Sequence, residues 1–231
     1  MNNKKYRIGM LVIATGKYNQ FVPPLFKSIK KHFLKNHDVT MFVFSDKEMP
    51  KKDGLIHIYQ EHQGWPNATL LRYHVFYNNK NVLKGMDYLY YCDADMLFID
   101  DVSDEILGEL VGTIHPGYYN TQRGTYETNE KSTAFVSKNE NGNYYAGGFN
   151  GGTFVNFLKM SEIIKNNIDI DIKNNITAIW HDESHLNRYF IDNPPTVKLS
   201  PSYCYPEQWE IPFDKKLLAL NKKHSELRNI L

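Results

Sequence analysis

Short apolar runs alternate with helical patterns of apolar residues over the first hundred residues of the chain. Three of the runs predict buried strands: Arg7–Ala14, Val39–Ser45 and Leu55–Tyr59. Apolar residues recur at helical spacing in two segments, one starting at Val22 and one spanning Leu70–Leu83. Strands that alternate with helices predict an α/β fold with a parallel sheet and crossover helices, whose ligands gather at the carboxyl ends of the strands.

The next predicted strand, at the start of Tyr88–Asp101, leads into two carboxylates. Asp93 and Asp95 interrupt an otherwise apolar and aromatic run, and burying acids there costs roughly several kcal/mol unless they are paired or bind a cation. Residues i and i+2 of an extended chain point to the same side, so one metal ion can contact both. Carboxylate oxygens are good ligands for Mg²⁺ or Mn²⁺, and these ions usually keep coordination positions open for substrate phosphates. The alternative is that both acids cap the following turn.

The second half of the chain is less regular. Val111–His115 predicts another strand, and Thr121–Asn143 is polar, as expected of a mobile loop or lid. Tyr144–Thr153 holds four glycines, so its backbone approaches another group closely or adopts positive φ. Its pattern is too irregular for a Rossmann or phosphate-loop fingerprint. The remaining predicted segments are helices at Phe154–Ile164 and Ile179–Phe190 and a basic tail from Leu217.

Composition places the chain among ordinary globular proteins. Its 231 residues are 42% hydrophobic, enough for a sizeable core. A net charge of +1 gives no global electrostatic reason to bind nucleic acid or an anionic membrane. The two cysteines, Cys92 and Cys204, form no disulfide framework and fit a reducing compartment. The apolar run Ile8–Ala14 is too short for a signal peptide, and no apolar stretch reaches the roughly 20 residues of a membrane-spanning helix.

The densest polar cluster lies at the start of the last predicted helix. Trp180 offers a ring face beside the acids Asp182 and Glu183. His181 and His185 are four residues apart, a spacing that lets two zinc ligands share a helix face. The zinc-protease pattern has Glu directly after the first His, however, and this chain has Asp182 there. A structural alternative is that the acids favour the helix N-terminus and His185 only packs.

Five motifs, in order along the chain, resemble those of family 6 glycosyltransferases. They are Asp-Ala-Asp at 93–95, His-Pro-Gly-Tyr-Tyr at 115–119, Tyr-Tyr-Ala-Gly-Gly at 144–148, Trp-His-Asp-Glu-Ser-His-Leu-Asn-Arg-Tyr-Phe at 180–190 and Leu-Ser-Pro-Ser-Tyr at 199–203. The similarity runs from Ile8 to Arg228, nearly the whole chain. This family includes the histo-blood group A and B transferases, the α1,3-galactosyltransferase and bacterial relatives.

The resemblance implies an α/β fold of the glycosyltransferase-A type, in which a Rossmann-like nucleotide-binding half packs closely on an acceptor-binding half. In this chain it implies one domain over residues 1–231. Residues 1–100 mainly bind the UDP-sugar, residues 101–215 mainly bind the acceptor, and residues 216–231 form the C-terminal basic tail. The activity implied is transfer of Gal or GalNAc from a UDP donor to O3 of an acceptor galactose, with an α linkage and retention of anomeric configuration.

The resemblance also assigns roles to residues. Asp93 and Asp95 match the family's metal ligands, so the cofactor implied is Mn²⁺ or Mg²⁺, which bridges the diphosphate and stabilises UDP as it leaves. Many bacterial members carry Asn in both places and work without metal, and this chain departs from them. Glu183 matches the glutamate beside the anomeric carbon, as a stabiliser of positive charge or as a nucleophile. It is the implied catalytic residue.

Donor and acceptor contacts follow from the same motifs. The donor-binding residues implied are Ala14, Tyr18, Arg72, Asp93, Ala94, Asp95, Ala146, Gly147, Gly148, Asp182, Lys222 and Arg228, and the acceptor-binding residues are His115, Trp180 and Glu183. Within the family, small residues where this chain has Gly147 and Gly148 go with GalNAc and bulkier ones with Gal. We therefore expect UDP-GalNAc as the donor, and bacterial relatives suggest Fucα1,2-Gal as the acceptor, giving an A-type product.

Three alternatives stay open at the level of sequence. One is a UDP-Gal-dependent α1,3-galactosyltransferase, one is a metal-dependent hydrolase, and one is a sugar-binding protein without activity. The retained carboxylates of Asp93, Asp95 and Glu183 argue against the last. The absence of a membrane anchor or stem leads us to expect a bacterial cytoplasmic enzyme, bound at most peripherally to a membrane, that acts on precursors of surface glycans.

Overall fold

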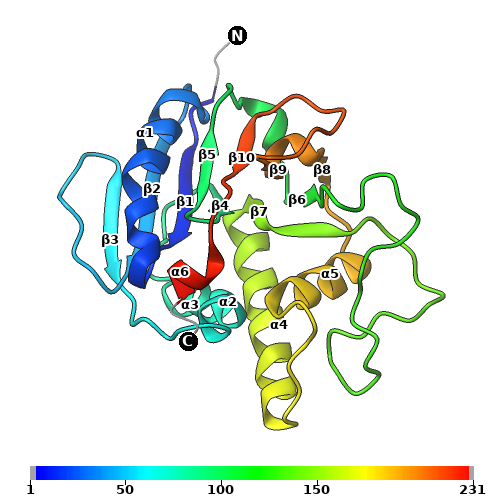
Figure 1. Cartoon of the computed structure of the whole chain (residues 1–231). Helices are drawn as coiled ribbons and strands as arrows, with labels where there is room; N and C mark the ends of the chain where they lie inside the picture. Colours follow the sequence, from blue (N-terminus) through cyan, green and yellow to red (C-terminus); the bar gives the residue numbers. More distant parts are fainter. Residues whose placement is uncertain (1–3, 229–231) are drawn as a thin grey trace.

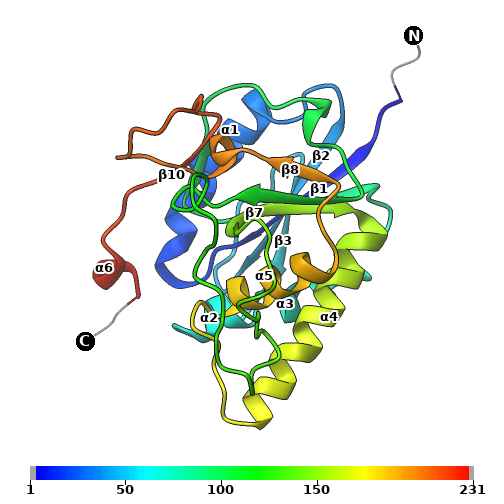
Figure 2. The same cartoon turned by 90° about the vertical axis from the view of Figure 1, so that its right-hand side faces the viewer.

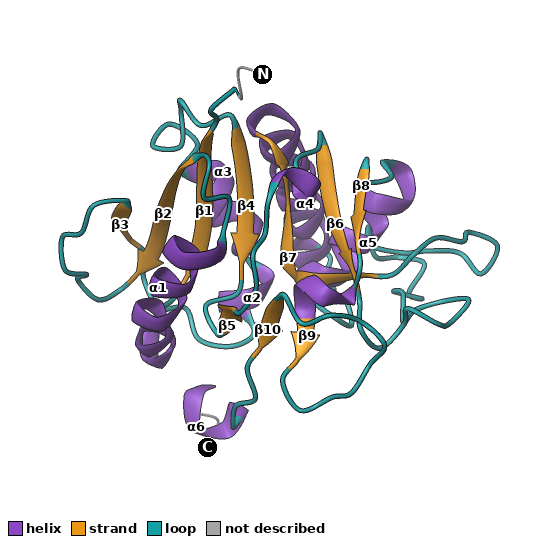
Figure 3. Cartoon of the chain, turned by 90° about the horizontal axis from the view of Figure 1, so that it is seen from above, coloured by secondary structure: helices purple, strands orange, loops and turns teal. Residues whose placement is uncertain are grey.

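The computed structural model describes residues 4–228, with His224 and Arg228 limited to their backbone. Seven strands form the main sheet in the order β3-β2-β1-β4-β7-β6-β8 (Figure 3). Their bounds are β1 Arg7–Ile13, β2 Asp38–Ser45, β3 Leu55–Tyr59, β4 Tyr88–Cys92, β6 Leu110–Ile114, β7 Tyr145–Thr153 and β8 Val197–Leu199. Strands β1 to β4 pair in parallel, and β8 is parallel to β6. Strand β7 runs antiparallel to β4 and β6, so the prediction of a parallel sheet is wrong at β7.

Strand β7 is the glycine-rich run that the sequence pattern left without a secondary structure. Gly151 pairs with Tyr90 of β4 on one side and with Val111 of β6 on the other. A Cβ at Gly151 would lie 2.7 Å from the carbonyl oxygen of Leu89 and closer still to the Tyr90 ring. The glycine therefore allows a close approach between strands, one of the two explanations that the sequence offered.

A bulge interrupts β7 at the edge of the sheet where the site lies. Gly112 of β6 pairs with Asn150, but the next residue, Thr113, pairs with Ala146, so residues 147–149 have no partner on β6. Phe149 still pairs with Cys92 of β4. The bulge releases the peptide groups of Gly147 and Gly148 from the β6 ladder, which leaves them available to side chains from other elements.

Helices cover both faces of the main sheet (Figure 2). On one face, α1 (Val22–His32) packs Leu25 and Ile29 against apolar residues of β1 and β2. The opposite face is covered by α2 (Asn67–Leu70), α3 (Arg72–Asn78), α4 (Phe154–Lys173) and α5 (Asp182–Asp192). Both cores are continuous and apolar, which is the expected way for a central sheet to bury its two faces.

The helix boundaries differ from the predicted ones. The helix predicted over Leu70–Leu83 is two short helices, and α3 ends at Asn78. Helix α4 continues beyond Ile164 to Lys173, because its later apolar residue Ile168 also packs against the sheet. Helix α5 begins at Asp182 rather than Ile179, since His181 has φ +52° and ψ −125°, which no α-helix accommodates.

A second sheet, of three strands, brings the end of the chain beside β5, which shortly follows β4 (Figure 1). Its strands are β5 (Met96–Phe98), β10 (Leu217–Ala219) and β9 (Tyr205–Pro206). Strand β10 pairs antiparallel with β5, matching Ala219 to Met96. The shorter elements are the 3₁₀ helices η1 (Gly16–Phe21), η2 (Asp104–Ile106) and η3 (Pro201–Cys204) and the final helix α6 (His224–Arg228). The predicted basic tail thus begins with a strand.

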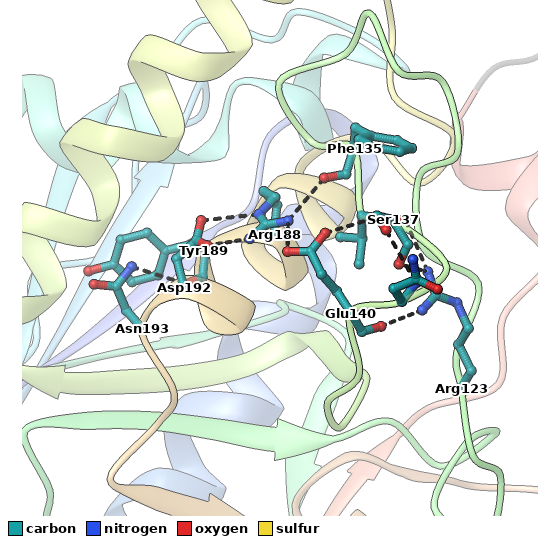
Figure 4. A network of polar contacts seen from close by, with 10 residues as sticks. Arg123, Phe135, Ser137, Glu140, Arg188, Tyr189, Asp192 and Asn193 are labelled. Atoms are coloured by element: carbon teal, nitrogen blue, oxygen red, sulfur yellow. Dashed lines mark hydrogen bonds and ion pairs between the residues drawn. The ribbon is translucent and has the colours of Figure 1, made fainter.

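The polar segment Thr121–Asn143, predicted as a mobile loop or lid, is held together by its own Arg123 and joined to α5 by Arg188 (Figure 4). Arg123 donates to the carbonyl oxygens of Val136, Ser137 and Glu140. Arg188 of α5 donates to the Glu140 carboxylate at 2.8 Å and to the carbonyl oxygen of Phe135 at 3.2 Å. These contacts argue against a freely moving lid. Over residues 4–228, no helix combines the length and apolar character needed to cross a membrane.

Candidate active site

An open cleft with a cavity volume of about 170 Å³ lies at the carboxyl ends of β1 and β4, the edge of the sheet where ligands were expected. Its walls come from η1, the loop after β3, α3, the residues after β4 and the C-terminal segment. Lining residues that matter below are Tyr18, Arg72, Asp93, Ala94, Asp95 and Lys222.

Arg72, the first residue of α3, joins four elements at the base of the cleft. Its guanidinium donates to the carbonyl oxygen of Gly147 in the β7 bulge at 2.7 Å. It also pairs with Asp182 of α5 at 3.1 Å and with Asp93 at 3.4 Å, and it stacks on the Tyr91 ring with Cζ 4.2 Å from the centroid. Arg72 is buried, so its planar, forked head acts as a permanent charge among these partners.

The buried acids around Arg72 and Arg72 itself shift one another's pKa values. Burial raises the pKa of Asp182 to about 7, with Arg72 opposing the shift and Asp93 and Glu183 adding to it. Burial works against the charge of Arg72 as well, but attraction to Asp182 and Asp93 raises its pKa overall. Three carboxylates therefore compete for one guanidinium, which is the arrangement expected where an enzyme adjusts acid strengths.

Glu183, one residue into α5, is held by two hydrogen bonds. The amide of Gly147 donates to Oε2 at 2.7 Å, and the hydroxyl of Tyr144 donates to Oε1 at 3.0 Å. Burial raises the pKa of Glu183 above its ordinary value, and these two bonds oppose that rise by favouring the ionised form. Asn187 fixes the helix itself, because its side chain makes two hydrogen bonds to the backbone of Tyr145.

The two aspartates after β4 make different contacts. Asp93 accepts a short hydrogen bond from the Tyr91 hydroxyl and pairs with Arg72, while its amide donates to the carbonyl oxygen of Gly148 at 2.9 Å. Asp95 is 4% exposed and forms an ion pair with Lys222. In the described structure, both carboxylates bind charged or hydroxyl groups, so the alternative that they cap the following turn is not supported.

A divalent cation fits this edge of the cleft. Among the described residues, no group of three or more His, Cys, Asp or Glu side chains gathers to hold a metal. Mg²⁺ and Mn²⁺ sites that use substrate phosphates need only one or two protein carboxylates, however. Asp93 and Asp95 both line the cleft, and the buried Asp95 carboxylate already has a cationic partner in Lys222. Their carboxylate oxygens are of the type that Mg²⁺ or Mn²⁺ prefers, and a metal at Asp95 would share that carboxylate with Lys222.

The structure does not support the zinc pair that the spacing of His181 and His185 suggested and that Asp182 already argued against. The His181 ring packs edge-on against Trp65, with centroids 5.3 Å apart. His185 is buried on the other side of α5, where its Nε2 lies 3.7 Å from a carboxylate oxygen of Asp171. Burial lowers the pKa of His185 to about 4. His185 thus packs in the interior, as the structural alternative held.

Two residues predicted to bind an acceptor, His115 and Trp180, contact Tyr144 and Glu183, respectively. His115 directly follows β6, and its ring centroid is 5.7 Å from that of Tyr144. Burial lowers the pKa of His115 to about 4, so its ring is neutral at ordinary pH. Trp180, just before α5, is 47% exposed, while its amide donates to the hydroxyl of Ser184. Its indole therefore offers an open apolar face.

The other predicted donor residues divide into three groups. Tyr18 and Ala94 line the cleft. Ala14 is fully buried between the cleft-lining residues Ile13 and Thr15, and Ala146 is buried at the start of the bulge. The side chain of Arg228 lies outside the described part of the structure, although its backbone ends α6.

Sequence reasoning missed four residues at the site: His62, Trp65, Tyr144 and Trp209. His62 and Trp65 line the cleft from the loop after β3, and His62 bonds to the hydroxyl of Thr15 at 2.9 Å. Trp209 is 48% exposed, and its ring lies close to Gly117: a Cβ added to that glycine would be 4.0 Å from the indole. An aromatic residue beside glycine or proline in a polar loop was the available signal for Trp65.

The chain belongs to glycosyltransferase family 6, whose model matches residues 1–230. The chain is 34% identical to histo-blood group ABO system transferase 1 of Rattus norvegicus, over 96% of this chain and 68% of the relative. It is 33% identical to human globoside alpha-1,3-N-acetylgalactosaminyltransferase 1, over 96% and 68%. It is also 30% identical to the O-antigen biosynthesis glycosyltransferase WbnI of Escherichia coli, over 94% and 95%. The protein is thus a glycosyltransferase, and its mixed sheet is consistent with the glycosyltransferase-A fold of the family.

Proposed function

We propose that this protein transfers GalNAc from UDP-GalNAc to O3 of a galactose acceptor, with retention of the α configuration. The observation that carries the proposal is the Gly147 peptide group. Its carbonyl oxygen binds Arg72 and its amide binds Glu183, so a donor-side cation and a carboxylate meet at one point beside the cleft. Relatives named as alpha-1,3-N-acetylgalactosaminyltransferases support the choice of reaction.

The residues divide the chemistry between them. Arg72, paired with Asp182, presents hydrogen-bond donors and positive charge to the sugar and its leaving diphosphate. Glu183 faces the anomeric centre, where its carboxylate stabilises the positive charge that builds as the bond to UDP breaks. Lys222 approaches from the tail and adds a second cation near the phosphates. A divalent metal held by Asp93 and Asp95 would stabilise the departing UDP.

The two glycines of the β7 bulge, Gly147 and Gly148, support the preference for GalNAc. A Cβ on Gly148 would lie 3.1 Å from a carboxylate oxygen of Asp93, and one on Gly147 would lie 3.3 Å from a carboxylate oxygen of Glu183. Two glycines in this position leave room for the N-acetyl group at C2 of the sugar. The same distances mean that Gly148→Ala presses on Asp93 as well as on the sugar pocket, so a panel of donors on the wild type is the cleaner test.

The acceptor is proposed to bind between Trp180 and His115, with the indole stacked on the galactose ring. Trp209 lies near Gly117, two residues after His115, and its exposed indole extends this aromatic surface. A fucosylated galactose, Fucα1,2-Gal, has the additional ring that such a surface accommodates. We propose it as the acceptor.

The test is release of UDP from UDP-GalNAc and from UDP-Gal, each with and without 2′-fucosyllactose, in Mn²⁺ and in EDTA. Acceptor-stimulated, metal-dependent release that favours UDP-GalNAc is the expected result. Preference for UDP-Gal would contradict the argument from Gly147 and Gly148. Release that the acceptor does not stimulate, with no new glycoside, would indicate the hydrolase instead. Full activity in EDTA would exclude Asp93 and Asp95 as ligands of an essential metal.

A further inference from the structure

We propose that Tyr144 is a positioning residue for the transfer step, whose hydroxyl fixes the orientation of the Glu183 carboxylate. The inference rests on the proposed function of Glu183 and adds a residue to which neither the family motifs nor the cleft lining assigns a role. Tyr144 immediately precedes β7 and is buried. Its ring therefore contributes through Glu183 rather than through contact with a donor in the cleft.

The geometry leaves the carboxylate little freedom. Tyr144 and Gly147 each donate one hydrogen bond, and they bind different oxygens of Glu183. Rotation of the carboxylate about its last bond would break both. A carboxylate that stabilises positive charge developing at one carbon accelerates the reaction more when its orientation is fixed in advance. Gly147 donates through its backbone, so the Tyr144 hydroxyl is the donor that a substitution can remove.

Tyr144 is itself rigidly held. Its ring packs edge-on against Tyr118 and Tyr126, with centroids 4.9 and 5.2 Å away, and its carbonyl oxygen accepts from the amide of His115 at 2.9 Å. Gly124 packs directly on the ring. The hydroxyl is thus placed by the aromatic cluster under the acceptor side of the site, and replacement by phenylalanine keeps that packing.

The surroundings also keep the hydroxyl a donor. Burial, followed by the nearby charge of Glu183, raises the pKa of Tyr144, so the phenol stays protonated at working pH. Charged or titratable groups that interact with Glu183 in the described part of the chain include Arg72, Asp93, Asp182, Tyr73 and Cys204. Arg72 bonds to the Gly147 carbonyl and to the two aspartates. Tyr144 therefore acts as a neutral donor to Oε1.

The test compares wild type and Tyr144→Phe in two assays, transfer to acceptor and acceptor-free hydrolysis of the UDP-sugar. We expect kcat to fall by a similar factor in both, about 10- to 100-fold, while KM for the donor stays within about twofold. The reason is that Glu183 acts when the bond to UDP breaks, which both reactions share. A merely structural role in the acceptor pocket would instead raise KM for the acceptor and leave hydrolysis unchanged, and that result overturns the inference.

Two further measurements make the assignment specific. In a Glu183→Gln background, Tyr144→Phe is expected to change kcat by less than about twofold, since residues that act as one unit are not additive. Tyr118→Phe is the matched control, because its hydroxyl bonds to Thr125 and not to Glu183, and it is expected to keep kcat. Independent losses in the double variant, or an equal loss in the control, contradict the proposal.

Failure of the proposed function gives a different result from failure of this inference. A wild type without acceptor-stimulated transfer, or a Glu183→Gln variant that is fully active, disproves the function. An active wild type whose kcat is unchanged by Tyr144→Phe disproves only the role of Tyr144. Should Tyr144→Phe lose its folded structure by circular dichroism, 3-fluorotyrosine at position 144 serves instead: it keeps the atoms of the bond but makes the hydroxyl a stronger donor, and an unchanged kcat there would contradict the proposal.

Discussion

Arg72 is the residue on which the site depends most, because one guanidinium neutralises carboxylates from two elements. Its partners Asp93 and Asp182 follow β4 and begin α5, far apart in sequence. Removing one partner of a buried ion pair typically costs about 3–5 kcal/mol, since the remaining charge has lost its counter-ion. The stability of the fold and the geometry of the site are therefore coupled through this side chain.

The first prediction concerns the shape of that side chain. Arg72→Lys keeps the charge, but a compact ammonium cannot reach the Gly147 carbonyl and both carboxylates at once. We expect the free energy of unfolding to fall by about 2–4 kcal/mol and kcat/KM to fall at least about 100-fold. Thermal unfolding and steady-state kinetics measure the two effects. Arg188→Lys, which alters an arginine bound to Glu140 and Asp192 near the surface, is the control and should leave kcat/KM within a small factor.

The second prediction concerns pH. Burial raises the pKa values of Glu183 and Asp182, the latter to about 7. A carboxylate that must be ionised to act is protonated, and inactive, below its pKa. We therefore expect kcat to rise with pH along an acid limb that lies above the ordinary value for glutamate and extends toward neutrality, with apparent pKa values that belong to the coupled cluster. A pH–rate profile with a limb near pH 4 would contradict this account.

Sequence reasoning found the carboxylates of the site more easily than their partners. Asp93 and Asp95 stand out because acids within an apolar or aromatic run need a chemical reason. Glu183 lies in a dense polar cluster, and its role was implied by the resemblance to family 6 glycosyltransferases. Tyr144 and Trp209 do not stand out, since tyrosine and tryptophan are common in both cores and surfaces. Their positions near the site arise from pairing across the sheet and from the loop between β9 and β10, which no local pattern records.

At the scale of elements, a strand could be predicted from the sequence only where its own residues have the composition typical of strands. Strands β1 to β4 were predicted because each is an apolar run of strand length. Strand β7 was not, because glycine is depleted in strands and side-chain periodicity disappears where side chains are absent. The same glycines create the bulge that frees the Gly147 peptide, so the stretch with the weakest secondary-structure signal carries the most important backbone contacts of the site.

The third prediction tests the packing of β7. Gly151→Ala adds a methyl group 2.7 Å from the Leu89 carbonyl oxygen and against the Tyr90 ring, both parts of the neighbouring strand that cannot move without disturbing the sheet. We expect a loss of about 2–3 kcal/mol, which lowers the unfolding temperature by roughly 4–12 °C for a chain of this size. In the control Gly142→Ala, the nearest atom is the flexible end of Ile191, and the unfolding temperature should change by no more than about 2 °C.

At the scale of the whole molecule, the two sheets explain how distant segments meet. The strand order places β4, from the first hundred residues, directly beside β7, from the second half. Strand β10 then pairs with β5, and the amide of Leu220 donates to the Asp95 carbonyl oxygen at 3.0 Å. Lys222 is therefore delivered to Asp95 by hydrogen bonds of the small sheet. The composition of the tail predicted only a basic segment, and the role of Lys222 came from the family resemblance, because the pairing of a three-residue strand is set by tertiary contacts.

The last prediction follows from the cation that the tail delivers. Lys222 pairs with Asp95, and the proposed divalent metal would share that carboxylate. Like charges close together repel unless a diphosphate lies between them. We expect Mn²⁺ and UDP to stabilise the fold together far more than either alone. At 100 times the dissociation constant, a ligand adds about 2.7 kcal/mol, which raises the unfolding temperature by roughly 5–11 °C. In the Asp93→Asn, Asp95→Asn double variant, UDP should stabilise equally with and without Mn²⁺. An undiminished joint effect in that variant would show that the metal binds elsewhere.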